Sequence, residues 1–445
     1  MMKNLLLLNF FIFIMLCVIK SQEVITGLQE NTLIIKALKD NKPITHKNNL
    51  YLHLPFIEDF SYQGPFPDDS LWEDKYVFIN NNYSAFPPTM GVATFDALND
   101  SGRIYYYASS FPFIADYLTS KPIQLDSVII GGLPVAIKIS DSLYFSFFYQ
   151  PQGIGDAPDI DDSLTLQFYS PADSTWRTVW STAGSDLQTF KNLNKTYFKQ
   201  ILIPITDSVL YYKKGFKFRF FNYASIGNNN LPGWCGNVDQ WNIDYIYLNI
   251  GRSMADTLYR DITFVSEPPS MLKYYQAMPW EQYNVSPTSS MLDSISLLIS
   301  NLSDITYNYQ YLYNVTDTNF SLIHSYNGGA FNLIPYYING YQNYLPHSTP
   351  PVNFTFPIMA GATDYIITHI LNPSAPADIR KQNDTLRFRQ KFRNYYAYDD
   401  GTAEAGYGLS IANGKVAYKF TLNKPDTLRG INVFFNRTFD NSNAQ

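Results

Sequence analysis

The chain has 445 residues, enough for about two to four domains that each bury a hydrophobic core. Apolar residues make up 46% of it and charged residues only 16%, a balance that excludes a disordered tail. The formal net charge is −6 with a pI near 5.4, and no basic block suited to phosphate backbones is present. The composition therefore argues against a nucleic-acid partner.

The first residues have the pattern of a secretory signal. Lys3 supplies a positive start, and residues 5–19 form an apolar run broken by one Asn. This run is shorter than the roughly 20 residues that a membrane-spanning helix needs, so we expect a signal peptide over residues 1–22 rather than an anchor. The mature protein is then secreted or held at the outer cell surface and is not an integral membrane protein. Cleavage would remove Cys17 and leave Cys235 without an intrachain disulfide partner.

Alternating apolar and polar residues predict strands through most of the chain. Aromatic residues reach 17%, with 36 Tyr and 32 Phe, and both residue types favour sheets. Gly-, Pro- and Asn-rich turns separate the alternating segments, and no helix longer than about ten residues is predicted. In the first half we expect strands at residues 143–149, 163–169, 176–180, 200–203, 216–221 and 241–248.

These elements predict an all-β fold built from successive domains. After a leader segment at residues 23–53, residues 54–250 carry many strands without intervening helices, which favours a jelly-roll sandwich. Residues 255–392 suit an immunoglobulin-like sandwich, with strands at 258–265, 295–299, 307–315, 352–357, 364–371 and 385–392. Residues 395–445 contain the expected strands 416–422 and 430–435. They are too few for an independent sandwich, so we expect a further β domain that continues beyond residue 445.

Three stretches resemble large surface proteins of Bacteroidetes. Residues 55–61 (PFIEDFS) and 87–99 (PPTMGVATFDALN) are similar to the opening of such proteins, and residues 396–408 (YAYDDGTAEAGYG) resemble a segment that recurs in them. The family is largely uncharacterised. Its members are exported by the type IX secretion system and usually end in a sorting domain, which these residues lack. The resemblance implies an outer-surface location and an export partner, the type IX machinery, but no activity.

The sequence carries none of the common catalytic signatures. It has no Gly-x-Ser-x-Gly elbow and no His-Glu-x-x-His zinc helix, and no His signature accompanies Cys235. A paired-carboxylate glycosidase would show itself only in the fold. We therefore predict that the chain is not an enzyme. Its histidines are scattered without metal-ligand spacing: His46, His53, His324, His347 and His369.

Calcium is the cofactor that the acidic side chains would suit best, because it takes six to eight hard oxygen ligands. The densest acidic loop contributes Asp156, Asp159, Asp161 and Asp162. A second set follows from a resemblance: residues 239–245 (DQWNIDY) are similar to the last strand of jelly rolls of the MAM and carbohydrate-binding type. In those folds a metal often bridges the first and last strands, which here implies Glu58, Asp59 and Asp239. A solvated loop or turn is the alternative for both sets.

Tryptophans are the candidates for a glycan-binding platform, since sugar C–H faces pack on aromatic rings. Burial in a β core is the alternative for each of them. Trp234, flanked by glycines in a long loop, is the predicted ligand contact, and the other candidates are Trp72, Trp176, Trp180 and Trp241.

Taken together, the sequence predicts a non-catalytic, secreted cell-surface adhesion or scaffold protein that contacts a surface glycan or protein. The alternative is the N-terminal accessory region of a larger secreted hydrolase whose catalytic domain lies beyond residue 445. The full reading frame would separate the two, because a downstream hydrolase signature favours the second.

Overall fold

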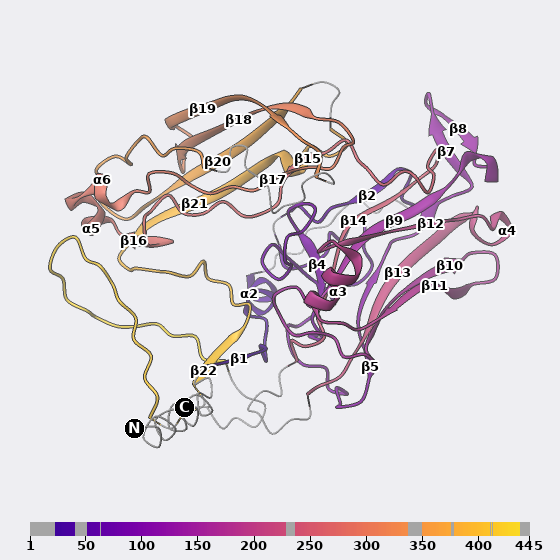
Figure 1. The fold of residues 1–445 in the computed structure, drawn as a ribbon, viewed down its shortest axis with the longest axis horizontal. Helices are drawn as coiled ribbons and strands as arrows, with labels where there is room; N and C mark the ends of the chain where they lie inside the picture. Colours follow the sequence, from indigo (N-terminus) through magenta and orange to yellow (C-terminus); the bar gives the residue numbers. More distant parts are fainter. Residues whose placement is uncertain are drawn as a thin grey trace, which may run out of the picture.

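The computed structural model describes residues 23–40, 51–62, 64–227, 236–336, 349–374, 378–409, 411 and 413–436. The predicted signal peptide, Trp234 and Cys235 lie outside these ranges. Strands dominate the described residues and the helices are short, so the expected all-β class is confirmed (Figure 1). Within those ranges, no helix combines the length and apolar character that crossing a bilayer requires.

The first unit is a sandwich of two mainly antiparallel sheets (Figure 1). One sheet has the order β11 (Thr175–Ala183), β10 (Ser163–Ser170), β13 (Lys214–Ala224) and β5 (Phe113–Thr119), with β6 (Ile123–Gln124) also pairing β13. The other has the order β12 (Lys199–Pro204), β9 (Tyr144–Pro151), β14 (Trp241–Asn249), β4 (Val92–Phe95) and β3 (Phe78–Asn80), with β2 (Phe56–Glu58) also pairing β14. Neighbours such as β5 and β13 are distant in sequence, as the crossovers of a jelly roll require.

Aromatic side chains fill the space between these sheets. On β13, Phe216, Phe218 and Phe220 point inward and are fully buried. They meet the opposite sheet edge to face, with ring centroids 4.7 Å apart for Phe145–Phe218 and 4.8 Å apart for Phe147–Phe220. Edge-to-face pairs place the positive ring edge against the negative ring face, which adds to the gain from burial. Much of the aromatic content therefore serves the core.

Short elements complete the first sandwich. A hairpin of β7 (Ser127–Ile130) and β8 (Leu133–Ala136) projects from it, next to η1 (Ile139–Asp141). The helices α3 (Leu187–Asn194) and α4 (Ser208–Tyr211) connect its strands. Each begins at an aspartate, Asp186 and Asp207, whose side chain accepts a backbone N–H of the first turn. Such caps satisfy donors that a helix start leaves unpaired.

The second unit is a smaller sandwich. Its larger sheet has the order β16 (Ala277–Pro279), β21 (Thr385–Arg393), β20 (Thr363–Pro373), β18 (Tyr307–Asp317) and β19 (Leu322–Leu333). β15 (Ile262–Phe264) pairs β17 (Ile299–Asn301) opposite it, and β16 runs parallel to β21. The two facing sheets agree with the expected sandwich, but the two-stranded second sheet and the parallel β16–β21 pair differ from the antiparallel sheets of an immunoglobulin domain. The short helices α5 (Trp280–Val285) and α6 (Pro287–Ser290) and the 3-10 turn η3 (Gln382–Asp384) join these strands.

Three strands expected in the second unit are shifted, shorter or missing. Of residues 295–299, only Ile299 belongs to a strand, β17. Residues 258–265 form a strand only over β15, and residues 352–357 form none, with a single bridge between Ser294 and Pro351 nearby. Conversely, the sequence did not suggest β19, because its apolar residues do not alternate regularly. Its burial pattern shows an edge strand that is mostly exposed.

The leader is fastened to the C-terminal part of the chain. β1 (Glu23–Thr26) pairs antiparallel with β22 (Gly406–Leu409), from Glu23 opposite Leu409 to Thr26 opposite Gly406 (Figure 1). Asn436 adds a 2.8 Å bond from its Nδ2 to the carbonyl oxygen of Gly27. The helix α2 (Thr32–Asp40) follows β1 and packs Ile34 on Phe78 and Tyr83 of the first sandwich.

The strands expected at residues 416–422 and 430–435 are not formed. Their apolar side chains are largely exposed, 61% for Val416 and 65% for Phe435. A strand gains stability from ladder hydrogen bonds with a neighbour, and among the described residues these segments have none. Tyr275 contacts this C-terminal part of the chain. Its ring centroid lies 5.0 Å from that of Tyr398, and its hydroxyl accepts a hydrogen bond from the Thr421 backbone N–H.

Candidate functional site

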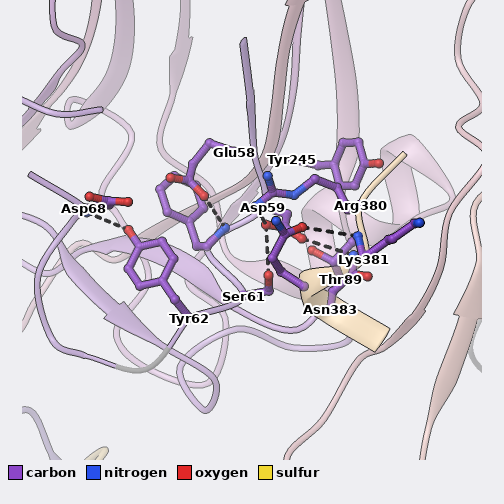
Figure 2. A network of polar contacts seen from close by, with 12 residues as sticks. Glu58, Asp59, Ser61, Tyr62, Asp68, Thr89, Tyr245, Arg380, Lys381 and Asn383 are labelled. Atoms are coloured by element: carbon purple, nitrogen blue, oxygen red, sulfur yellow. Dashed lines mark hydrogen bonds and ion pairs between the residues drawn. The ribbon is translucent and has the colours of Figure 1, made fainter. Parts of the chain in front are cut away.

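A buried ionic network lies where the two sandwiches meet (Figure 2). Asp59 follows β2 directly and is fully buried. Its carboxylate accepts a 2.7 Å hydrogen bond from the Arg380 guanidinium and a 3.1 Å bond from the Asn383 amide. Arg380 and Asn383 come from the connection between β20 and β21. The pair therefore joins the start of the first sandwich to the end of the second.

Further buried groups extend the network around Asn383. Its Nδ2 also lies 3.1 Å from an Asp261 carboxylate oxygen, and the Tyr245 hydroxyl donates to the same oxygen at 2.8 Å. Asp244, the neighbour of Tyr245 on β14, accepts from the backbone N–H and the hydroxyl of Thr89. The Tyr245–Asp261 bond joins β14 to the second unit, and the Thr89–Asp244 bonds hold the segment before β4 against β14.

Burial dominates the electrostatics of this junction. Glu58 is 1% exposed and accepts bonds from the Phe60 N–H and the Trp72 indole. Loss of solvation, with the adjacent Asp59 charge as the second cause, raises its pKa from 4.5 to about 7. Burial also raises the pKa of Asp244 and of Asp261 well above the usual range for a carboxyl. These pKa values mean that some of the carboxyl groups carry protons near neutral pH.

The buried contacts of this junction hold the two sandwiches together. Glu58, Asp59, Asp244 and Asp261 are each no more than 1% exposed, so no substrate reaches them in this conformation. A backbone bond from Met90 N–H to the Phe264 carbonyl, 2.9 Å long, runs beside the ionic contacts. The sequence identified Glu58 and Asp59 as candidate metal ligands but not the partners of Asp59, because Arg380 and Asn383 lie in a separate domain.

The metal set of Glu58, Asp59 and Asp239 is not brought together. Glu58 pairs with Ile246 on β14, five residues beyond Trp241, a separation of about 16 Å at 3.3 Å per residue. Asp239 precedes Trp241 and so lies at the far end of that strand. One ion could not bind all three, because metal–oxygen bonds are about 2.3–2.6 Å long for calcium.

Asp239 instead joins the acidic loop. Its Oδ1 accepts from the Asp159 N–H at 3.2 Å and its Oδ2 from the Ser225 N–H at 2.7 Å. The Ser225 hydroxyl donates to Oδ2 of Asp162 at 2.6 Å, and Asp162 is fully buried. Burial raises the pKa of Asp239 to about 8, and the charges of Asp162 and Asp156 act in the same direction. Asp161 is exposed beside them.

The described residues contain no group of three or more His, Cys, Asp or Glu side chains arranged to hold a metal ion. The cluster of Asp156, Asp159, Asp162 and Asp239 therefore lacks a closed ligand set in this conformation. Calcium binding stays a prediction for this cluster alone, since Glu58 and Asp59 do not lie near Asp239.

The two sheets of the first sandwich differ in what covers their outer faces. On the β9–β14 sheet, Tyr259 of the second unit contacts Ser146 through its hydroxyl at 2.9 Å. The same hydroxyl accepts from Gln200 at 2.6 Å, and the Tyr259 ring packs on Phe148 and Tyr247. This outer face is thus buried against the second unit.

The β11–β10–β13–β5 sheet has aromatic rings on its outer face, interleaved with cations; most of these rings are partly exposed, and Phe221 is buried among them at 7%. We call this surface the aromatic face. It consists of Tyr117, Gln167, Tyr169, Trp176, Lys217, Arg219, Phe221 and Tyr223. Their strand neighbours Phe168, Phe218 and Phe220 point inward, so these residues point away from the core. The register sets Tyr169 between Trp176 and Lys217, and Gln167 beside Arg219.

Arg219 is the centre of the aromatic face. Its guanidinium lies 4.2 Å from the Trp176 ring centroid and 5.4 Å from that of Tyr117. Its Nε donates to the Gln167 amide oxygen at 2.9 Å. Within the described residues, the two terminal NH₂ groups make no protein hydrogen bond. They are oriented donors on a rigid, ring-lined surface.

The structure separates the tryptophan candidates. Trp72 and Trp241 are at most 2% exposed, and Trp180 packs on Phe147 and Tyr149 at the core boundary. Trp176 is partly exposed and lies on the aromatic face. Trp234, the predicted ligand contact, lies outside the described residues. Residues 217–223 could have predicted the aromatic face. Aromatic residues there occupy outward as well as inward positions of an alternating strand.

No family model and no curated protein matches this sequence. Among solved structures, the chain is similar to the Endo-D glycoside hydrolase domain from Streptococcus pneumoniae, with 6% identity and a TM-score of 0.26 over 74% of this chain and 39% of that one. It is also similar to a β-glucuronidase from Parabacteroides merdae, with 11% identity and a TM-score of 0.25 over 62% and 27%. A β-glucuronidase from Ruminococcus gnavus gives 8% identity and a TM-score of 0.23 over 78% and 47%.

The chain spans less than half the length of these three proteins. At such TM-scores the overlap is too small to indicate a shared fold or a shared activity.

Proposed function

We propose that this protein is a non-catalytic, exported cell-surface adhesion or scaffold protein whose first sandwich contacts glycan chains through the aromatic face. The observation that carries the proposal is the contrast between the two outer faces of that sandwich. One is covered by the second unit through Tyr259, whereas the other keeps most of its rings partly exposed to solvent. Aromatic rings grouped on one uncovered sheet face, with cations between them, are the kind of surface that often marks a binding site.

The chemistry of the aromatic face suits saccharides. Ring faces of Trp176, Tyr169 and Tyr117 offer flat apolar surface for sugar C–H groups. Arg219 and Gln167 supply hydrogen-bonding groups between the rings. All five residues lie on strands, and binding sites on strands have a better-defined geometry than binding sites on loops.

The buried junction supports the scaffold part of the proposal. The Asp59–Arg380 pair and the Asn383 bridge fix the two sandwiches to each other. A fixed pair of domains presents the aromatic face in a constant direction relative to the rest of the chain. Such rigidity helps a surface protein because less freedom is lost when it binds.

Export rests on the N-terminal pattern and on the resemblance to type IX secreted proteins. The apolar run at residues 5–19 supports removal of a signal peptide and an outer-surface location. N-terminal sequencing of protein shaved from intact cells tests this point. A start near residue 22 is expected, and an intact Met1 in the cytoplasm would refute it.

Affinity electrophoresis tests the glycan contact. The mature chain is run in gels that contain β-glucan, xylan, polygalacturonate or chondroitin sulfate, and at least one of these should retard it. Trp176→Ala should abolish the retardation. Tyr106→Ala, at a ring that is 97% exposed but outside the aromatic face, should not. If no saccharide retards the protein, or both variants behave alike, the glycan contact is wrong.

A further inference from the structure

A separate open cavity of about 370 Å³ lies where three segments of the chain meet. One wall is α2 of the leader, a second is the end of β3 with residues 80–83, and a third is residues 402–404. The aromatic face shares no residue with it. Its volume falls in the lower part of the range of small-molecule sites, about 300–1,000 Å³.

Asn31 lines this cavity and has a buried side-chain donor without a partner among the described residues. The residue is 3% exposed, and its Oδ1 caps α2 by accepting from Leu33 N–H at 3.1 Å and Ile34 N–H at 3.2 Å. Its Nδ2 has no hydrogen-bond partner among the described residues. A buried donor without an acceptor is destabilising, so a ligand acceptor that reaches it from the cavity would be stabilising.

The facing walls carry acceptors that are held in place. Asn82 donates to Oε1 of Glu404 at 2.7 Å, and Asn81 donates to Oε1 of Glu267 at 2.7 Å. In the described part of the chain these bonds use Oε1, which leaves Oε2 of each carboxylate to accept another bond. Tyr83 anchors the third wall by donating to the Ala403 carbonyl at 3.0 Å.

The charge of the lining decides between ligand classes. Among the described residues around the cavity, three carboxylates face one ammonium: Asp40, Glu267, Glu404 and Lys36. This excess of negative charge disfavours an anion. The Asn31 donor disfavours a cation, since its N–H groups would point at positive charge. A hydroxyl both donates and accepts, and so it can satisfy the Asn31 donor on one side and the carboxylates on the other.

We propose that this cavity binds a neutral, hydroxyl-rich ligand the size of a single sugar unit. The site is distinct from the aromatic face and does not depend on it. The leader, the first sandwich and the C-terminal segment each supply one wall, so the bound ligand would also tie α2 to residues 402–404.

Titration calorimetry on the mature chain with galactose, mannose, fucose and N-acetylgalactosamine tests the proposal. At least one of these neutral sugars should bind, while glucuronate and the cation glucosamine should bind at least tenfold more weakly. Asn31→Asp keeps the helix cap but replaces the donor with an acceptor, and should weaken binding about tenfold. Glu404→Gln changes a different wall of the cavity and should also weaken sugar binding about tenfold. It serves as the test variant if Asn31→Asp does not fold.

Two controls separate this site from other effects. Glu281→Gln makes the same chemical change at an exposed position of the second unit, and Trp176→Ala alters only the aromatic face; both should bind the sugar as the parent does. The proposal is overturned if none of the neutral sugars binds, if glucuronate or glucosamine binds best, or if Glu404→Gln and Glu281→Gln behave alike. Loss of binding in Trp176→Ala would assign the signal to the aromatic face instead.

Discussion

Arg380 donates a 2.7 Å hydrogen bond to Asp59, a residue 321 positions earlier in the chain. The carboxylate is fully buried, and the Arg380 side chain is 20% exposed. The bond lies between two sandwiches with separate cores. It makes the relative orientation of those domains depend on one ion pair and its neighbours.

Removing the cation should destabilise the protein strongly. Arg380→Met leaves the Asp59 carboxylate buried without its counter-charge, and we expect the free energy of unfolding to fall by about 3–5 kcal/mol. Chemical denaturation measures it. Arg103→Met is the matched control, because its pair with Glu30 is 3.6 Å long and exposed and should cost at most about 1 kcal/mol. Equal losses for the two variants would contradict the role of the junction.

The stability of the protein should depend on pH through Glu58. Its pKa is raised from 4.5 to about 7 in the folded state, so the folded chain binds this proton more tightly than the unfolded chain. Stability is therefore greatest below pH 4.5, falls as the pH rises from 4.5 to 7, and stays low above 7. The effect is on the order of 3 kcal/mol for this group.

Thermal melting at pH 5 and pH 8 checks this sign. The melting temperature should be higher at pH 5, and Glu58→Gln should reduce the difference because the amide cannot ionise. Glu281→Gln, which removes an exposed carboxylate, should leave the difference as it is. A larger difference in Glu58→Gln would show that the sign is wrong.

Binding at the aromatic face should depend on the donors of Arg219 as well as on rings. Arg219→Met keeps an apolar stem against Trp176 but removes the guanidinium, and we expect saccharide retardation to weaken about tenfold with little change in melting temperature. Arg177→Met removes a guanidinium that pairs with Asp173 near the edge of the same sheet, and should bind normally. If both variants bind saccharide normally, the prediction is wrong and Arg219 does not contribute to binding.

Calcium should bind at the acidic loop. Asp162 has a buried Oδ1 without a hydrogen-bond partner among the described residues, and Asp239 lies beside it. Millimolar calcium should then raise the melting temperature relative to chelator, because binding to the folded state adds about 2.7 kcal/mol to the free energy of unfolding at a hundredfold excess over the dissociation constant. Both Asp159→Asn and Asp239→Asn should abolish the shift, whereas Glu58→Gln should keep it. Equal melting temperatures with calcium and chelator would remove the prediction.

The sequence predicted much of the fold where local pattern decides it. The alternation in residues 216–221 predicted a strand with Phe216, Phe218 and Phe220 on one side, and β13 has that form. The same reasoning failed at residues 416–422, where Val416, Tyr418 and Phe420 alternate but no described strand pairs with them. Alternation reports which side chains share a face, and it cannot supply the neighbouring strand that the backbone needs.

The candidate sites depended more on the fold. The sequence identified Asp59 and Asp239 as acidic residues of interest but assigned them to one site, whereas β14 separates them and gives each a different set of partners. The sequence indicated Trp176 as one of several candidate tryptophans. Only the position of the second unit shows that the sheet face of Trp176 is uncovered, whereas Tyr259 covers the outer face of the opposite sheet. Local residue order determined the all-β class and the inward and outward side of each strand, because side chains alternate with the backbone. Tertiary structure alone decided which outer face is buried, which acids meet and where a cavity forms, because these depend on contacts between segments hundreds of residues apart.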